Sequence, residues 1–165
     1  MYPLEVLLKS NIKDILIITA AEHQYMFKNL LGDDHEYGAN FSYAIQSEPN
    51  GIADAIKIGK HFIGKDTVCL ITGDTILLFD KFKSLIAKAE RAAKVSGSAT
   101  IFVSDEICDY QYGKVIMTTG GKKYKIVGND SNYNYLSITG IYISFSILLW
   151  RLPKELQLLN EDYLK

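Results

Sequence analysis

The sequence has almost no excess of charge of either sign, and this limits the partners that it can attract. Its 18 basic and 19 acidic side chains leave a formal net charge of −1, and the lysines and arginines are scattered rather than grouped. A domain that binds nucleic acid typically carries a basic patch or stripe. The charge pattern therefore gives no reason to expect a DNA or RNA partner.

Cysteines and long apolar runs are also scarce. Cys69 lies within an apolar run and Cys108 in a polar stretch, so the cysteines indicate neither a disulfide framework nor a zinc site. The N-terminus lacks the pattern of a secretory signal, and the apolar segment 141–150 is interrupted by serines and too short to cross a bilayer. With 48% hydrophobic and 22% charged residues, the composition is typical of a soluble globular protein. We expect one domain over residues 1–165, located in the cytoplasm.

A phosphate-binding loop and a metal-ligand pattern are missing as well. Residues 59–66 are one residue short of a P-loop, and an aspartate stands where a Mg²⁺-binding hydroxyl is needed. This segment also ends a predicted helix and leads into a strand, which is the reverse of the P-loop order. We therefore interpret Gly64 as a helix C-cap. The three histidines, at positions 23, 35 and 61, lack metal-ligand spacing.

What the sequence does contain is a regular alternation of strand and helix patterns. Runs of apolar and β-branched residues predict strands over 14–19, 41–46, 67–72 and 98–103. Apolar residues at helical spacing predict helices over 4–9, 22–31, 52–63 and 82–93. This order is typical of an α/β fold, here a Rossmann-like, mostly parallel sheet with helices on both faces.

The alternation of strand and helix patterns changes after about residue 105, and the pattern at the start of the chain is also unusual. A β-hairpin is predicted over 112–117 and 123–127, a last strand over 137–144 and a short helix over 153–159. In doubly wound folds the first strand and the loop that follows it usually bind phosphate. Here the first strand pattern already follows a helix, so we expect the first strand and the phosphate loop to be missing.

Two polar positions follow predicted strands. Gln46 ends the second strand and leads through Pro49-Asn-Gly51 into a helix, and Gly73-Asp74 follows the third strand. Ligands of open α/β sheets bind at this carboxyl edge. An amide suits the edge of a nucleobase, and a carboxylate suits Mg²⁺ or a sugar hydroxyl. Both segments are also typical of ordinary turns, so the residues alone leave the two interpretations open.

Several segments taken together resemble the glucose-1-phosphate thymidylyltransferases, a family of sugar nucleotidyltransferases. The resemblance covers nearly the whole chain and is carried by residues 1–7, 12–19 and 30–33, the Gln-x-x-Pro-x-Gly block of 46–51, Phe62-Ile-Gly64, Gly73-Asp74, Tyr112-Gly113-Lys-Val and Ile138-Thr-Gly-Ile-Tyr142. It implies a reaction of dTTP with glucose 1-phosphate that yields dTDP-glucose and pyrophosphate, a step of dTDP-sugar biosynthesis. Mg²⁺ is the implied cofactor, and the sugar phosphate would attack the α-phosphorus in line.

The same resemblance implies roles for individual residues. Gln46 and Gly51 would contact the thymine base, and Asp74 would bind Mg²⁺ close to the sugar. The sugar pocket would be lined by Tyr112, Gly113 and Ile138. The implied partners are thus a thymine nucleotide and a sugar 1-phosphate, with no nucleic acid and no membrane.

The chain departs from the family pattern at the groups that neutralise phosphate charge. The Gly-Gly-x-Gly-Thr-Arg loop is absent, the Glu-Lys pair falls near 126–129 without either charge, and the second metal-binding aspartate falls at about Asn160. Losing one positioned electrostatic group costs about 10²–10³ in rate. We therefore expect a homologue truncated at both ends, weak or inactive alone, with weak Mg²⁺ binding. The alternative is a non-catalytic nucleotide-binding or regulatory pseudoenzyme that acts with a second copy or a full-length relative.

Overall fold

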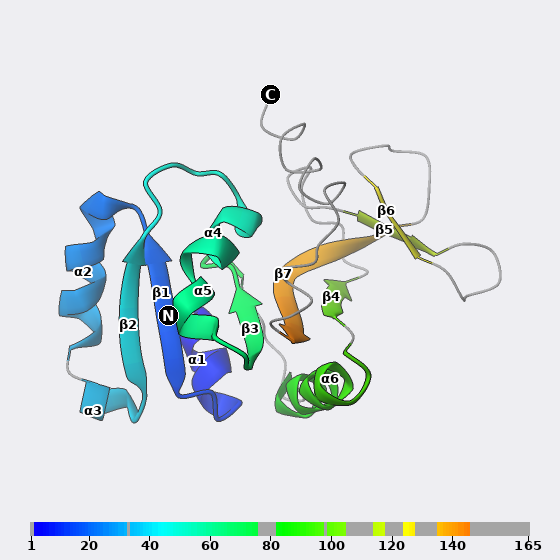
Figure 1. Ribbon diagram of the computed structural model, residues 1–165, viewed down its shortest axis with the longest axis horizontal. Helices are drawn as coiled ribbons and strands as arrows, with labels where there is room; N and C mark the ends of the chain where they lie inside the picture. Colours follow the sequence, from blue (N-terminus) through cyan, green and yellow to red (C-terminus); the bar gives the residue numbers. More distant parts are fainter. Residues whose placement is uncertain are drawn as a thin grey trace.

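The computed structural model describes residues 2–32, 34–75, 82–97, 99–104, 114–117, 124–127 and 135–145 (Figure 1). Helices and strands alternate as predicted, which confirms the α/β class. In chain order the elements are α1 (Tyr2–Lys9), β1 (Asp14–Thr19), α2 (Ala21–Leu31), α3 (Asp34–Tyr37), β2 (Asn40–Ile45), α4 (Ile52–Ile58), α5 (Lys60–Ile63), β3 (Thr67–Ile71), α6 (Phe82–Ser96), β4 (Thr100–Ser104), β5 (Lys114–Met117), β6 (Tyr124–Val127) and β7 (Tyr135–Phe145).

The described strands form two hydrogen-bonded sheets rather than one. β1 and β2 pair in parallel, from Asp14 opposite Asn40 to Thr19 opposite Ile45. In the second sheet β7 is antiparallel to β3, β4 and β5, and β5 also pairs with β6 as the predicted hairpin. The prediction that the four strands near 14–19, 41–46, 67–72 and 98–103 share one sheet is therefore wrong in its pairing. Because β3 and β4 both oppose β7, they still run parallel to each other.

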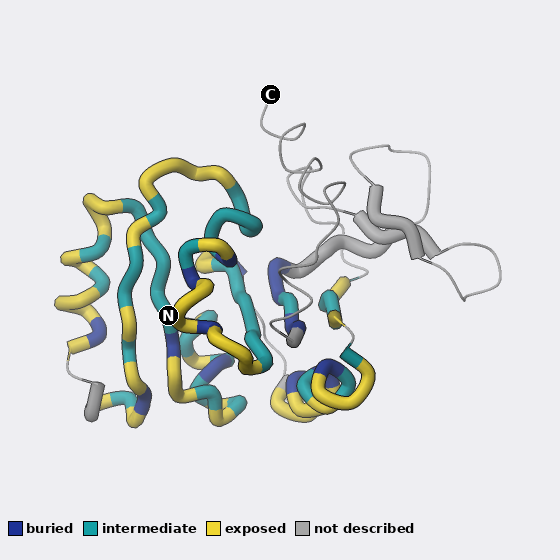
Figure 2. Tube along the Cα trace, in the orientation of Figure 1, coloured by how far each residue is buried: buried dark blue, intermediate teal, exposed yellow. Residues whose placement is uncertain are grey.

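The inserted strand β7 is the centre of one hydrophobic core. Ile141 and Ile143 of β7 are 0% and 1% exposed, and they pack with Ile86 and Ala89 of α6. The apolar spacing of α6 places both of these residues on its face toward the sheet, and Figure 2 shows the buried positions of α6 beside exposed ones. Burial of each large aliphatic side chain contributes about 1.5–3 kcal/mol. Both the packing of its apolar side chains and its backbone hydrogen bonds to β3 and β4 thus stabilise the position of β7.

A second core joins β1 to α1. Leu7 of α1 is buried with Ile15 and Ala39, and Cys69 and Ile71 of β3 pack against this cluster. The neighbouring residues of each strand point the other way, because side chains alternate along a strand. They face α4 and α5, so α1 and these two helices cover opposite faces of β1 and β3, which agrees with the prediction of helices on both faces.

The predicted helix over 52–63 is divided at Gly59 into α4 and α5. α5 ends at Gly64, whose N–H donates to the Lys60 carbonyl at 3.1 Å, so the C-cap interpretation of Gly64 is confirmed. The helix predicted over 153–159 lies outside the described residues. None of the helices in the described ranges is long and apolar enough to cross a membrane.

Candidate functional site

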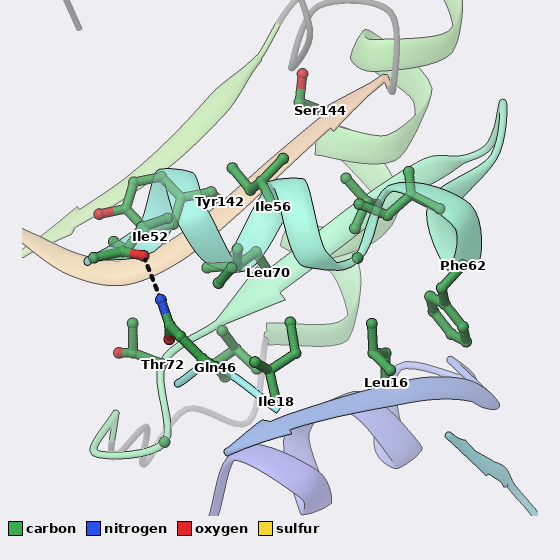
Figure 3. Close-up of a pocket in the computed structure, with 17 residues that line it drawn as sticks. Leu16, Ile18, Gln46, Ile52, Ile56, Phe62, Leu70, Thr72, Tyr142 and Ser144 are labelled. Atoms are coloured by element: carbon green, nitrogen blue, oxygen red, sulfur yellow. Dashed lines mark hydrogen bonds between the residues drawn. The ribbon is translucent and has the colours of Figure 1, made fainter. Parts of the chain in front are cut away.

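Gln46 lies at the carboxyl edge of the β1–β2 pair, where the sequence places it. Its backbone N–H donates to the Thr19 carbonyl at 2.9 Å, which extends the pairing of β1 with β2 by one step. Its side-chain Nε2 donates to the Gly51 carbonyl at 3.2 Å and to Asp54 Oδ2 at 3.1 Å. Figure 3 shows the first of these hydrogen bonds crossing one end of a pocket.

These partners decide which way the Gln46 amide faces. A carbonyl and a carboxylate oxygen both accept hydrogen bonds, so the amino group of the amide has to point toward Gly51 and Asp54. Both N–H donors are then engaged within the protein. The amide oxygen Oε1 is held on the other side of the group, where it can accept a hydrogen bond from a ligand.

Gly51 allows the chain to turn back onto Gln46. It is the N-cap of α4 and has φ 80° and ψ −173°, a conformation that is essentially restricted to glycine. This backbone places the Gly51 carbonyl within hydrogen-bonding distance of the Gln46 side chain. The glycine of the Gln-x-x-Pro-x-Gly block is therefore required by the turn, independently of any ligand.

Asp74 lies on a tight turn after β3. The Thr75 N–H donates to the Thr72 carbonyl at 3.2 Å, and the two threonine hydroxyls lie 2.7 Å apart. Thr75 is 8% exposed, whereas Asp74 is exposed. Asp74 is thus an exposed residue on a turn whose two ends, Thr72 and Thr75, are hydrogen-bonded to each other.

Gly140 of β7 holds this turn against the second sheet. Its carbonyl accepts a hydrogen bond from the Thr72 N–H at 3.1 Å, and its φ is +77°. A Cβ atom added at Gly140 would collide with the Thr72 hydroxyl and would lie 2.8 Å from the Thr75 hydroxyl. The absence of a side chain at this position therefore lets the turn that carries Asp74 pack directly on β7.

A pocket of about 370 Å³ extends from Gln46 between β1 and β3 (Figure 3). The residues that line it include no charged side chain, and most are aliphatic; polar groups are supplied by Gln46, Thr72, Tyr142 and Ser144. Burial raises the pKa of the Tyr142 phenol, so this residue is a neutral hydroxyl at physiological pH. The pocket is thus apolar in its body and polar near Gln46 and Thr72.

The residues present offer limited support for a metal ion. Within the described part of the chain, no three His, Cys, Asp or Glu side chains are grouped closely enough to hold one. The Asp74 carboxylate could supply one oxygen. Mg²⁺ commonly keeps several waters and uses one or two carboxylates together with substrate phosphates, so a single aspartate is compatible with a metal that arrives with a nucleotide.

The Cys69 thiol gives the stability of the protein a defined pH dependence. Burial raises its pKa to about 12. In the unfolded chain the thiol loses its proton above its ordinary pKa, about 8.5, while the folded protein retains it. The stabilisation is complete below that pH and is lost as the pH rises toward the folded value, by about 1.4 kcal/mol per pH unit.

We expect urea unfolding at pH 8, 9 and 10 to show this fall in the free energy of unfolding, and Cys69→Ala to have a shallower fall by about that amount. Tyr142 titrates equally in both proteins and cancels in the comparison. If the free energy of unfolding fell equally with pH in the two proteins, Cys69 would not be the cause of the pH dependence.

The structure brings together some of the predicted site residues. Gln46 and Gly51 are in contact, and Asp74 lies on the neighbouring turn after β3. Ile138 is in β7, paired with Val103, and its side chain is outside the described part. Tyr112 and Gly113 lie outside the described residues.

Sequence reasoning missed four residues of this edge. They are Asp54, Thr72, Thr75 and Gly140, none of which the sequence pattern places in the site. A threonine at each end of Thr72-Gly-Asp-Thr75 was the available signal, because Thr hydroxyls often close such turns. No local signal pairs Gly140 with that turn, since 65 or more residues separate them in the chain.

Comparison with known proteins gives consistent results. The nucleotidyl transferase family matches residues 1–143. A glucose-1-phosphate thymidylyltransferase from Neisseria gonorrhoeae is 40% identical over 140 residues, which cover 83% of this chain and 42% of that protein. One from Neisseria meningitidis is 48% identical over 101 residues, or 61% of this chain and 34% of that protein. The chain thus spans less than half the length of these curated relatives.

Solved structures share the fold. A crystal structure from Bacillus anthracis, described as a glucose-1-phosphate thymidylyltransferase in complex with a sucrose, has a TM-score of 0.75 and 24% identity, and covers 99% of this chain and 68% of that chain. An apo UDP-glucose pyrophosphorylase has a TM-score of 0.68 and 15% identity, over 90% of this chain and 65% of that chain. With the family match over residues 1–143, these similarities show that the chain belongs to the nucleotidyl transferase family.

Proposed function

We propose that this chain carries the base-binding part of a glucose-1-phosphate thymidylyltransferase site, and that it binds a thymine nucleotide with little or no turnover on its own. The observation that carries the proposal is the oriented Gln46 amide, held by Gly51 and Asp54 at the carboxyl edge of the β1–β2 pair. The sugar-nucleotide chemistry of the relatives supports the choice of ligand.

The Gln46 oxygen suits a base that presents a ring N–H. Thymine and uracil carry an N–H at N3, which can donate to Oε1. Cytosine has a lone pair at N3, so its ring nitrogen would repel the same oxygen. The apolar wall beside Gln46, which includes Ile18 and Ile52, can cover the face of the base. The site therefore favours thymine or uracil over cytosine.

Asp74 is the residue that would hold a metal ion, and the bound ion would supply charge neutralisation on the nucleotide phosphates. The protein positions this carboxylate on a turn that the hydrogen bonds between Thr72 and Thr75 stabilise. The sugar-binding roles of Tyr112, Gly113 and Ile138 are part of this proposal, which rests for them on the family resemblance. We also propose a cytoplasmic location.

Asp54 is a positioning residue in this account, because it touches the Gln46 amide rather than the base. We expect Asp54→Ala to weaken thymidine binding about three- to tenfold, since loss of one hydrogen bond of about 0.5–1.5 kcal/mol frees the amide to rotate. Asp54→Asn retains an acceptor oxygen and should restore most of the affinity. Gln46→Leu should remove detectable binding, and Lys57→Ala, an exposed change on the same helix, should leave it unaltered.

Titration of ¹⁵N-labelled protein with thymidine, followed by the amide shifts of residues 46–55, measures these affinities. Binding by Gln46→Leu at the wild-type level would contradict the proposal. Equal losses for Asp54→Ala and Asp54→Asn would contradict the positioning role alone.

A second function, nucleotide sensing without catalysis, is favoured by one observation. The contacts that orient the Gln46 amide lie within residues 46–54 and require no metal ion. The two functions share the same base site and differ in turnover, so release of pyrophosphate distinguishes them.

A further inference from the structure

Helix α2 lies at the margin of the fold, where Figure 1 shows it beside β2. One side of the helix packs toward that strand: Leu31 on this side is 3% exposed, and Phe27, one turn earlier, is half-buried. The Lys28 ammonium lies 5.4 Å from the centre of the Tyr43 ring of β2. These residues determine which side of α2 faces the sheet and which side faces away from it.

The side of α2 that faces away from the sheet is also apolar. Tyr25, Met26 and Leu30 lie there and are 75%, 55% and 56% exposed, and Figure 2 shows exposed positions along the length of the helix. They are three of the nine exposed large apolar side chains in the described part of the chain, so this exposure is concentrated on α2. A surface helix usually carries polar residues opposite its buried stripe, as α6 does with Lys88 and Arg91. The outward side of α2 therefore has the composition of a surface that is covered by a partner.

Two exposed polar residues, Glu22 and Asn29, share this side with the three apolar ones. We refer to the five residues together as the outer α2 face. Met26 is the midpoint of the 11-residue helix, so a second copy turned end for end would overlap with it along its whole length. In that pairing Tyr25 lies opposite Met26 of the second copy, and Glu22 lies opposite Asn29 of the second copy. The outer α2 face is thus complementary to itself.

We propose that the outer α2 face binds a second copy of this chain, with the two α2 helices antiparallel about a two-fold axis. Each contact then occurs twice. The Met26 thioether packs on a tyrosine ring, which is a favourable contact, and the Glu22 carboxylate accepts a hydrogen bond from the Asn29 amide. A parallel pairing would instead bring the two Glu22 carboxylates together, whereas the antiparallel one also places opposite ends of the helix dipoles side by side.

The size of the outer α2 face determines the strength of the expected dimer. A helix of 11 residues is about 16 Å long, and one such pair buries less than the roughly 1,200 Å² that stable complexes bury. We therefore expect a reversible dimer with a dissociation constant of about 10⁻⁴ M. This inference rests on α2 and is independent of the proposed base site.

Sedimentation velocity between about 10 μM and 1 mM measures the dissociation constant, and ¹⁵N amide shifts over the same range identify the surface. We expect dimerisation, with the concentration-dependent shifts centred on residues 21–31. Met26→Glu should weaken it at least about tenfold, because two carboxylates then meet within the apolar contact. Val95→Glu makes a comparable change at an apolar residue of α6 that is 83% exposed, and should leave the dissociation constant unaltered.

An exchange of the two polar residues tests the antiparallel register. Asn29→Glu places a second carboxylate opposite Glu22 and should weaken dimerisation about three- to tenfold. Adding Glu22→Asn restores the pair with its members exchanged, so the double variant should regain most of the affinity. Since these positions are exposed, the variants should fold as the wild type does, which circular dichroism checks.

A wild-type protein that stays monomeric at about 1 mM would overturn the proposal. Wild-type dimerisation by Met26→Glu, or an equal loss in Val95→Glu, would overturn it as well, because the association would then not use the outer α2 face. A double variant no better than Asn29→Glu would contradict the antiparallel pairing on which the proposal depends.

Discussion

Replacing Gly140 by alanine is expected to lower the free energy of unfolding by about 3 kcal/mol. A left-handed backbone costs a residue with a Cβ atom about 1–2 kcal/mol, and Gly140 has φ +77°. The new methyl group would also collide with the Thr72 and Thr75 hydroxyls, and overpacking of this kind costs about 1–3 kcal/mol. Both effects act at the contact that ties the Asp74 turn to β7.

Gly38 offers a matched control for the collision. It has φ +61°, but a Cβ added there meets nothing within 4 Å, so Gly38→Ala should cost only about 1–2 kcal/mol. Adding Thr72→Ala to Gly140→Ala removes the closest colliding group and should recover part of the loss. Urea unfolding of the four proteins measures these differences. Equal losses at Gly38 and Gly140, with no recovery in the double variant, would show that the turn does not press on β7.

The 165-residue chain is expected to turn over dTTP and glucose 1-phosphate at least about 10⁴-fold more slowly than a full-length relative. Nucleotidyl transfer depends mainly on positioning and on charge neutralisation. The sequence lacks the glycine-rich phosphate loop, the Glu-Lys pair and the second aspartate of the family pattern. Each such group contributes about 10²–10³ in rate, and groups that act together lose less than the product when removed together.

Release of pyrophosphate in the presence of Mg²⁺ measures this turnover, with the N. gonorrhoeae relative as the positive control. The Asp74→Asn variant tests whether any residual rate belongs to this site, because it removes the carboxylate and keeps the turn. A wild-type rate within about tenfold of the relative would contradict the expectation of a weak or inactive chain. Undetectable turnover together with thymidine binding would favour the sensing function.

Local sequence patterns predicted most helices and strands. The main error, the expectation of a single sheet, concerns the pairing of strands that are far apart in the chain. Strand 14–19 was predictable from its run of apolar, β-branched residues, and helix α2 from its length and the glycine that follows Leu31 as C-cap. The place of β7 between β3 and β4 was not, because its apolar residues suit any buried strand position and its partners lie far away in the chain.

The candidate site was predictable only in part for a similar reason. Gln46 and Gly51 form a contiguous block whose turn places them in contact, so their proximity follows from local geometry. No local pattern distinguishes Asp54 from the other polar residues of 52–63. Its contact with Gln46 depends on the unusual Gly51 backbone, which determines how the helix starts relative to β2.

The base-reading role of Gln46 is tested most directly by comparing thymidine with N3-methylthymidine in the same NMR titration. The added methyl group removes the single N–H that the account places against Gln46 Oε1 and leaves the sugar unchanged. We predict that N3-methylthymidine binds at least about tenfold more weakly, because it cannot donate this hydrogen bond and its methyl group would crowd the Gln46 oxygen. Equal affinity for the two nucleosides would contradict the account.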